Sequence, residues 1–436
     1  MITRILKKYN NELFVEYKLE RVVITVFLSI LELIVYFHHT DAINIILSDG
    51  TIQRIAAYIL PTGGMFFLNY YIIAPLIILL LCLIWESYGH TSFIKEIEQV
   101  EDKCTQWLAG MNVKWGPYDS ANEYYRDHRI ANMCEAELAI FKAAKTSSHS
   151  VIYNAVRGKI YDSKSQYGWY SRTLGTSLGE ETVVCTSMAL YLFALDRSGE
   201  LNHDELSCIC KHLWECRSEN GWGVYVKEYL PTECRMGNTF WALRAINCYQ
   251  DYISQKEFED YVVSIYQKSN HGMFGYHIND IPSVCITAMF FVLLHELPQR
   301  LYDRIIKFYD IDKAIDYIYK EFCVNNIQCE MESLPGIGIV DKVPWQHITI
   351  SYVLKVLSIS WAQGKLSLLQ KKKLINRVRL LIKENIYDAG GGKYYYHPEG
   401  MRKSNKGNFT YPSAYLIVGL YELRKALIKN KETRIV

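Results

Sequence analysis

Residues 220–225 read Asn-Gly-Trp-Gly-Val-Tyr and form the clearest copy of a glycine–aromatic turn that recurs along the chain. The tyrosines that close the first four copies lie at positions 118, 170, 225 and 276, so the period is about 50–55 residues. A fixed period of this size indicates a repeat architecture. The other copies are Trp115-Gly116-Pro117-Tyr118, Tyr167-Gly168-Trp169-Tyr170, Gly272-Met273-Phe274-Gly275-Tyr276 and Gly390-Gly391-Gly392-Lys393-Tyr394-Tyr395.

An apolar segment with helical spacing follows each turn, and more amphipathic segments lie between these. Each repeat therefore predicts one buried helix and one half-exposed helix. Six such pairs predict an all-α (α/α)6 toroid over residues 100–430, in which the inner helices form a barrel. An open stack of pairs is the alternative, but it would leave the apolar helices partly exposed to water. The buried segments are 129–141, 184–195, 237–246, 284–294, 347–357 and 412–423.

The N-terminal part of the chain has the composition of a membrane anchor, which we place at residues 22–88. Residues 66–85 carry no charge over twenty positions, the length of a helix that crosses a bilayer. Residues 22–37 form a shorter candidate that contains Glu32. We expect two transmembrane helices, with one span plus a packed or interfacial helix as the alternative.

Basic residues predict the orientation of this anchor. Residues 1–21 hold five of them, whereas the loop between the candidate spans holds only Arg54. The positive-inside rule then places segment 1–21 in the cytoplasm. Two spans return the chain there, so we expect a multi-pass membrane protein with a cytoplasmic C-terminal domain. The twelve cysteines fit that compartment as reduced thiols.

The turns and the first residues of the inner helices are expected to cluster at one end of the barrel. Helix N-termini there carry unpaired N–H groups and partial positive charge, which suits an apolar ligand with an anionic head. The turn aromatics either line this cavity or staple each turn to the barrel rim. The candidate cavity residues are Trp115, Tyr170, Trp222, Tyr225, Phe274, Tyr276 and Tyr395.

The turn Asn-Gly-Trp-Gly-x-Tyr, followed by a threonine-containing helix, resembles the repeats of the terpenoid cyclase and protein prenyltransferase α/α toroids. The resemblance covers roughly residues 100–430. Phe274 opens a run that reaches Cys285, and His347 follows some sixty residues later. Both fall where the prenyltransferase β subunit has metal ligands, so the resemblance implies zinc, and an isoprenoid as substrate.

The chain also departs from the family pattern. Ser283 replaces the aspartate two residues before the cysteine, and Tyr276 and Asn279 replace the basic residues that bind diphosphate. No Asp-x-Asp-Asp motif of the squalene-cyclase type occurs. The groups needed for prenyl transfer or protonation-initiated cyclisation are therefore missing from the expected positions.

Zinc at Cys285 and His347 needs a third ligand for a catalytic site. Asp280, Asp341 and Cys234 are candidates; the alternative is a buried cysteine and a histidine bound to a backbone carbonyl. Acids that precede the inner helices suit N-terminal turns electrostatically. In a catalytic reading Asp280, Glu233 and Asp341 would be the general acid and base, which requires two of them to converge.

Three functions remain open from the sequence. The first is a membrane-tethered prenyltransferase- or cyclase-like enzyme acting on an isoprenoid or another lipid. The second is a non-catalytic toroid that binds a lipid, peptide or protein partner at the membrane. The third is a carbohydrate-active α/α barrel, which needs paired carboxylates across its cavity. The net charge of only +2 does not indicate a nucleic acid as partner.

Overall fold

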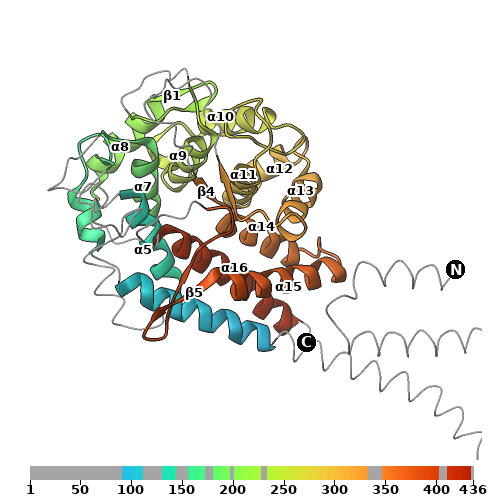
Figure 1. The fold of residues 1–436 in the computed structure, drawn as a ribbon. Coiled ribbons are helices and arrows are strands. Elements are labelled where there is room, and N and C mark those ends of the chain that lie inside the picture. The colour runs from blue at the N-terminus through green and yellow to red at the C-terminus, as the bar shows by residue number, and fades with distance from the viewer. Residues whose placement is uncertain are drawn as a thin grey trace, which may run out of the picture. The chain divides into compact units, whose positions relative to one another are not determined.

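Six inner helices of the chain form a closed ring in the computed structural model (Figure 1). Each contacts the next along the chain, and the last contacts the first. They are α5 (Ile130–Ala143), α7 (Val183–Asp196), α9 (Met236–Cys248), α11 (Val284–Glu296), α14 (Ile350–Ala362) and α16 (Thr410–Thr433). The structure describes residues 91–110, 130–143, 156–171, 180–196, 201–226, 233–331, 346–401 and 410–433.

A second layer of helices surrounds this ring, and each outer helix precedes an inner helix in the sequence (Figure 1). The outer helices are residues 91–110, residues 156–162, α8 (His203–Glu215), α10 (Gln255–Gln267), α13 (Ile311–Cys323) and α15 (Leu368–Asn385). Two short helices, η2 (Gln250–Tyr252) and α12 (Gln299–Ile305), lie in the connections that follow inner helices.

Burial follows the pattern that the sequence predicts for the two layers. In α11 every residue from Val284 to Leu294 is buried, because the helix has neighbours on all sides. In α13 only one face is buried, and its residues recur at helical spacing, among them Ala314, Ile318 and Phe322. The prediction of an α/α toroid of six helix pairs is confirmed, and the ring is closed rather than an open stack.

The expectation of a multi-pass membrane protein with a cytoplasmic C-terminal domain is corrected. Within the described residues, none of the helices combines the length and the apolar composition that crossing a bilayer requires. The predicted anchor 22–88, with its candidate spans 22–37 and 66–85, lies outside the described residues, as does segment 1–21. The ring belongs to the compact unit Phe93–Val436.

Three antiparallel hairpins connect outer helices to inner helices. The hairpin of β1 and β2 precedes α9, that of β3 and β4 precedes α14, and that of β5 and β6 precedes α16. Two glycine–aromatic turns lie in these hairpins, residues 220–225 with β1 and β2 and residues 390–395 with β5 and β6. The turns at 167–170 and 272–276 lie in the outer-to-inner connections that precede α7 and α11. The strands are β1 (Arg217–Ser218), β2 (Gly221–Trp222), β3 (Cys329–Met331), β4 (Gln346–Ile348), β5 (Ile386–Gly390) and β6 (Lys393–Tyr396).

One hydrogen bond recurs between the turns and the inner helices. The backbone N–H of a buried aromatic residue in the turn donates to a hydroxyl near the start of the following inner helix. This contact fixes the turn on the helix at the same height in each of these repeats. The pairs are Trp169–Thr186, Trp222–Thr239, Phe274–Thr287 and Tyr396–Ser413, at 2.9, 3.1, 3.1 and 3.0 Å.

The two tryptophans of this series also bind the preceding outer helix. The indole N–H of Trp169 donates to the carbonyl of Ile160 at 2.8 Å, and that of Trp222 donates to the carbonyl of Leu213 at 2.7 Å. Both acceptors lie near the C-terminal end of an outer helix, where carbonyl groups lack helical partners. Each tryptophan therefore joins an outer helix to an inner helix through one buried side chain.

The glycine of the turn is required by the same contact. A Cβ at Gly221 would overlap the hydroxyl oxygen of Thr239, and the φ angle of Gly221 is +123°, where residues with a side chain are strained. We expect Gly221→Ala to lower the free energy of unfolding by about 2–4 kcal/mol, measured by urea denaturation. Gly364→Ala is the control, because Gly364 has φ +72° but open space around the added Cβ. Equal losses in the two variants would contradict the steric explanation.

Candidate functional site

A cavity of about 40 Å³ lies on the inner side of the ring. Its volume is little more than the ~30 Å³ that one water molecule occupies in the liquid. Five inner helices contribute to its wall, which combines charged, phenolic and aromatic side chains. The lining residues are Glu135, Leu138, Lys142, Tyr191, Trp241, Arg244, Ser351, Tyr352, Lys355, Ala414, Tyr415 and Val418.

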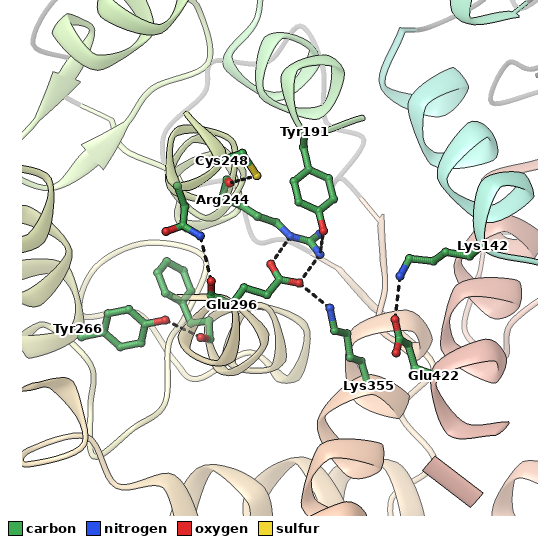
Figure 2. A network of polar contacts seen from close by, with 10 residues as sticks. Lys142, Tyr191, Arg244, Cys248, Tyr266, Glu296, Lys355 and Glu422 are labelled. Carbon is green, nitrogen blue, oxygen red and sulfur yellow. Dashed lines mark hydrogen bonds and ion pairs between the residues drawn. The ribbon is translucent and has the colours of Figure 1, made fainter. Parts of the chain in front are cut away.

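A network of buried charges adjoins the cavity, and Figure 2 shows its side chains pointing toward one another from α7, α9, α11 and α14. Arg244 donates from Nε and Nη2 to the two carboxylate oxygens of Glu296, both at 2.6 Å. Its Nη2 also donates to the hydroxyl of Tyr191 at 2.7 Å. Lys355 donates to Glu296 at 2.6 Å. One carboxylate therefore holds two cations from neighbouring helices.

A second ion pair stands beside this network, between α5 and α16. Lys142 donates to Glu422 at 2.8 Å, and Figure 2 shows the pair opposite Lys355. Both side chains keep some exposure, 20% for Lys142 and 17% for Glu422. Solvent therefore reaches this part of the ring, whereas Arg244 is only 6% exposed.

Glu135 of α5 is the carboxyl group in the cavity wall. The hydroxyl of Tyr415 on α16 donates to its Oε1 at 2.6 Å. Its Oε2 is shielded from solvent and has no hydrogen-bond partner among the described residues. A buried oxygen of this kind beside a cavity indicates a water or ligand position, because buried polar groups in proteins are almost always paired.

The pKa values of two carboxyl groups in this region move in opposite directions. Burial raises the pKa of Glu135 to about 8, against the opposing effect of the hydrogen bond from Tyr415. Burial also acts to raise the pKa of Glu296, but Arg244 and Lys355 outweigh it and lower the pKa to about 2. At neutral pH the first group is mostly a neutral acid and the second is a carboxylate. Pairs of this kind are typical of acid–base sites.

The turn aromatics that the sequence proposed as cavity residues do not line the ring cavity where the structure describes them. Trp222, Phe274 and Tyr276 are buried between helices, Tyr170 and Tyr395 are half-buried, and Tyr225 is 42% exposed. Their contacts attach the turns to neighbouring helices. The ring of Tyr395, for example, lies 5.7 Å from that of Trp107. Phe274 borders a separate surface hollow beside the turn. Trp115 lies outside the described residues.

Of the candidate catalytic acids, the structure describes Asp280 and Glu233. Asp280 accepts the backbone N–H of the next residue, Ile281, at 2.8 Å. Glu233 is exposed, and Asp341 lies outside the described residues. Neither Asp280 nor Glu233 borders the ring cavity. Their catalytic role stays a prediction.

Cys285 and His347, the candidate zinc ligands, lie in neighbouring elements. Cys285 Sγ is 3.9 Å from the carbonyl of Ile348, and the ring of His347 lies 4.8 Å from that of Tyr276. Burial raises the pKa of the Cys285 thiol well above its ordinary value, and the nearby Glu330 raises it further. In the described part of the chain, no three His, Cys, Asp or Glu side chains gather as a metal site. Zinc binding stays a prediction.

Glu330 occupies the helix N-terminus that the sequence assigned to an anionic ligand. Its carboxylate accepts the backbone N–H groups of Val284 and Cys285, both at 2.9 Å, and the hydroxyl of Ser283 at 2.7 Å. The hydroxyl of Tyr276 donates to it at 3.3 Å. At α11, therefore, the unpaired N–H groups already have an anionic partner from within the chain.

Sequence reasoning missed the residues that do converge. Arg244 and Lys355 are the single charged residues of α9 and α14, Glu296 ends α11, and Glu135 stands in α5 with Glu137 and Lys142. A charge in a buried helix is costly unless it is paired, so it marks either an ion pair or a site. The sequence shows these charged residues in buried helices, but it does not show which of them form ion pairs with one another.

A closed ring of six helix pairs with polar groups in its interior defines an α/α toroid. Among solved structures, a cellobiose 2-epimerase from Spirochaeta thermophila DSM 6192 matches the chain with a TM-score of 0.51 and 13% identity, over 78% of this chain and 98% of the epimerase. At this identity the likeness shows the fold alone. Comparison with models of protein families and with curated proteins found no match.

The resemblance to terpenoid cyclases and protein prenyltransferases is thereby corrected. The matching structure belongs to a different branch of the α/α toroids. In this chain the glycine–aromatic turn recurs because it attaches each turn to the following inner helix. A membrane-tethered prenyltransferase- or cyclase-like activity has no support from this match.

Proposed function

We propose that the chain is a carbohydrate-active α/α barrel that catalyses proton transfer on a sugar. The observation that carries this proposal is Glu135, a residue of the cavity wall whose buried carboxyl oxygen Oε2 has no hydrogen-bond partner among the described residues. The toroid fold, shared with a cellobiose 2-epimerase, supports a sugar as substrate by analogy of fold. A tryptophan and tyrosines in the wall supply the apolar and polar surfaces that sugar rings contact.

The hydrogen bonds of Glu135 define its role. Tyr415 donates to Oε1, so Oε1 is an acceptor and the acidic proton resides on Oε2. In the proposed step this proton is given to the carbonyl oxygen of an open-chain sugar while water takes the proton from the adjacent carbon. The enediol that forms returns to a sugar when water reprotonates that carbon and Glu135 recovers its proton. Glu296 stays ionised and holds Arg244 and Lys355, two other residues of the cavity wall, in place. Glu135 is the general acid in this proposal, and it becomes the base after giving up its proton.

The test is an assay for sugar turnover across pH. The full chain is incubated with a panel of reducing sugars in D₂O, and proton NMR follows deuterium incorporation and new epimers; release of reducing ends follows hydrolysis. Because the acid must be protonated, and burial raises the pKa of Glu135 to about 8, we expect the rate to be level below pH 8 and to fall above it. A panel without turnover would contradict the enzymatic proposal.

One observation favours a second function, a barrel that binds a sugar or another partner without chemistry. The cavity of about 40 Å³ is much smaller than a sugar ring, so the interior of this conformation is largely filled. Sugar binding without turnover, detected by calorimetry, would support this second function. Binding with deuterium incorporation would exclude it.

A further inference from the structure

Three cations belong to the wall of the ring cavity, whereas the carboxylates paired with them do not. Lys142, Arg244 and Lys355 all line the cavity. The carboxylates that neutralise them, Glu296 and Glu422, are not part of its wall. The wall therefore presents three cationic groups and one carboxyl group, that of Glu135.

Hydrogen-bond donors remain on these cations after their ion pairs are made. Within the described residues, Arg244 donates from Nε and Nη2, which leaves its Nη1 amino group for a ligand. Lys355 and Lys142 each make one hydrogen bond among the described residues, although an ammonium group has three N–H bonds. A ligand that fits this wall supplies acceptors rather than donors.

The charges of the whole cluster leave a single positive excess. Three cations are set against the two ionised acids, Glu296 and Glu422. Burial raises the pKa of Glu135 to about 8, so its carboxyl group adds no full negative charge at neutral pH. A monoanion balances this excess, whereas a phosphate ester brings close to two charges at neutral pH.

We infer that the cavity binds the carboxylate group of an acidic sugar, a uronate, through Lys355, Arg244 and Lys142. This inference rests on the proposed function and names the class of its substrate. The Oε2–H group of Glu135 then donates a charge-assisted hydrogen bond to the same carboxylate or to a neighbouring hydroxyl.

Calorimetric titration of the full chain at pH 6.5 tests the inference with glucuronate, glucose and glucose 6-phosphate. We expect glucuronate to bind at least about tenfold more tightly than either of the others, the factor that one charge-assisted contact supplies. Lys355→Met is expected to reduce glucuronate affinity about tenfold and to leave glucose affinity unchanged. Lys142→Met, at the separate pair with Glu422, is a second variant in case the first fails to fold.

Lys365→Met is the matched control, because Lys365 also pairs with an acid, Asp312, but outside the cavity wall. It should leave all three affinities unchanged; an equal loss in this variant would mean that overall charge, and not the cavity, attracts the uronate. Glucose binding as tightly as glucuronate, or tighter binding of glucose 6-phosphate, would overturn the inference while the proposed function stands. Failure of all sugars to bind or react would overturn the proposed function itself.

Discussion

Glu135→Gln is expected to lower the rate of sugar turnover by about 10²–10⁴-fold, the range that a general acid contributes. The glutamine keeps the shape of the side chain, and its carbonyl oxygen can still accept the hydrogen bond from Tyr415. It lacks the acidic proton that we place on Oε2. The loss should therefore appear in kcat, measured by deuterium incorporation, with a much smaller change in KM.

Glu137→Gln is the control for this variant. Glu137 lies two residues further along α5 and is buried, and burial raises its pKa to about 9, but it does not border the cavity. Its substitution should leave the turnover rate unchanged. If both variants lose activity equally, the loss comes from the packing of α5. If Glu135→Gln keeps full activity, Glu135 is not the acid.

Glu296→Gln is expected to lower the free energy of unfolding by about 3–5 kcal/mol, the cost of leaving buried charges without their counterion. The glutamine keeps one acceptor oxygen but no charge, so Arg244 would lose its two-fold ionic pairing and Lys355 its counterion. Asp312→Asn serves as control, because the side chain of Asp312 is 80% exposed and its pairing with Lys365 is screened by water. That variant should stay within about 0.5 kcal/mol of the wild type. Urea denaturation at pH 7 measures both.

The pH dependence of stability gives an independent check on Glu296. Its pKa in the folded chain is lowered to about 2 from an ordinary value of 4.5. A lowered carboxyl pKa means that the stabilisation is present above pH 4.5 and is lost as the pH falls toward 2. Glu296→Gln should remove this part of the acid dependence. A variant that is as stable as the wild type at pH 7 would contradict the ion-pair account.

The ring could be predicted from the sequence because one local contact is repeated. The turn that contains Gly221 and Trp222 has counterparts in other repeats. In each of them the backbone N–H of an aromatic residue donates to a hydroxyl of the inner helix, as Trp222 does to Thr239. The two partners of this contact lie close together in the sequence, so its repetition can be recognised as a fixed spacing of turns. Closure followed from the apolar character of the inner helices, since α11 is buried on every side.

The site could not be predicted in the same way. Glu135 meets Tyr415 across 280 residues, and Arg244 meets Glu296 across 52. Such meetings depend on how each helix is rotated about its own axis, which an all-round apolar pattern leaves undefined. The recurrence of the turn aromatics suggested that they line the cavity. It reflects packing instead, since Trp222 is fully buried between two helices.

The contact between α16 and α5 joins the last inner helix to the first. During synthesis the N-terminal helices emerge first, so the ring stays open until the final helix has left the ribosome. Glu135 is made early, but its partner Tyr415 arrives only with α16. Glu135 therefore acquires this hydrogen bond last, and a chain released before α16 is made lacks the part of the cavity wall that Ala414, Tyr415 and Val418 supply.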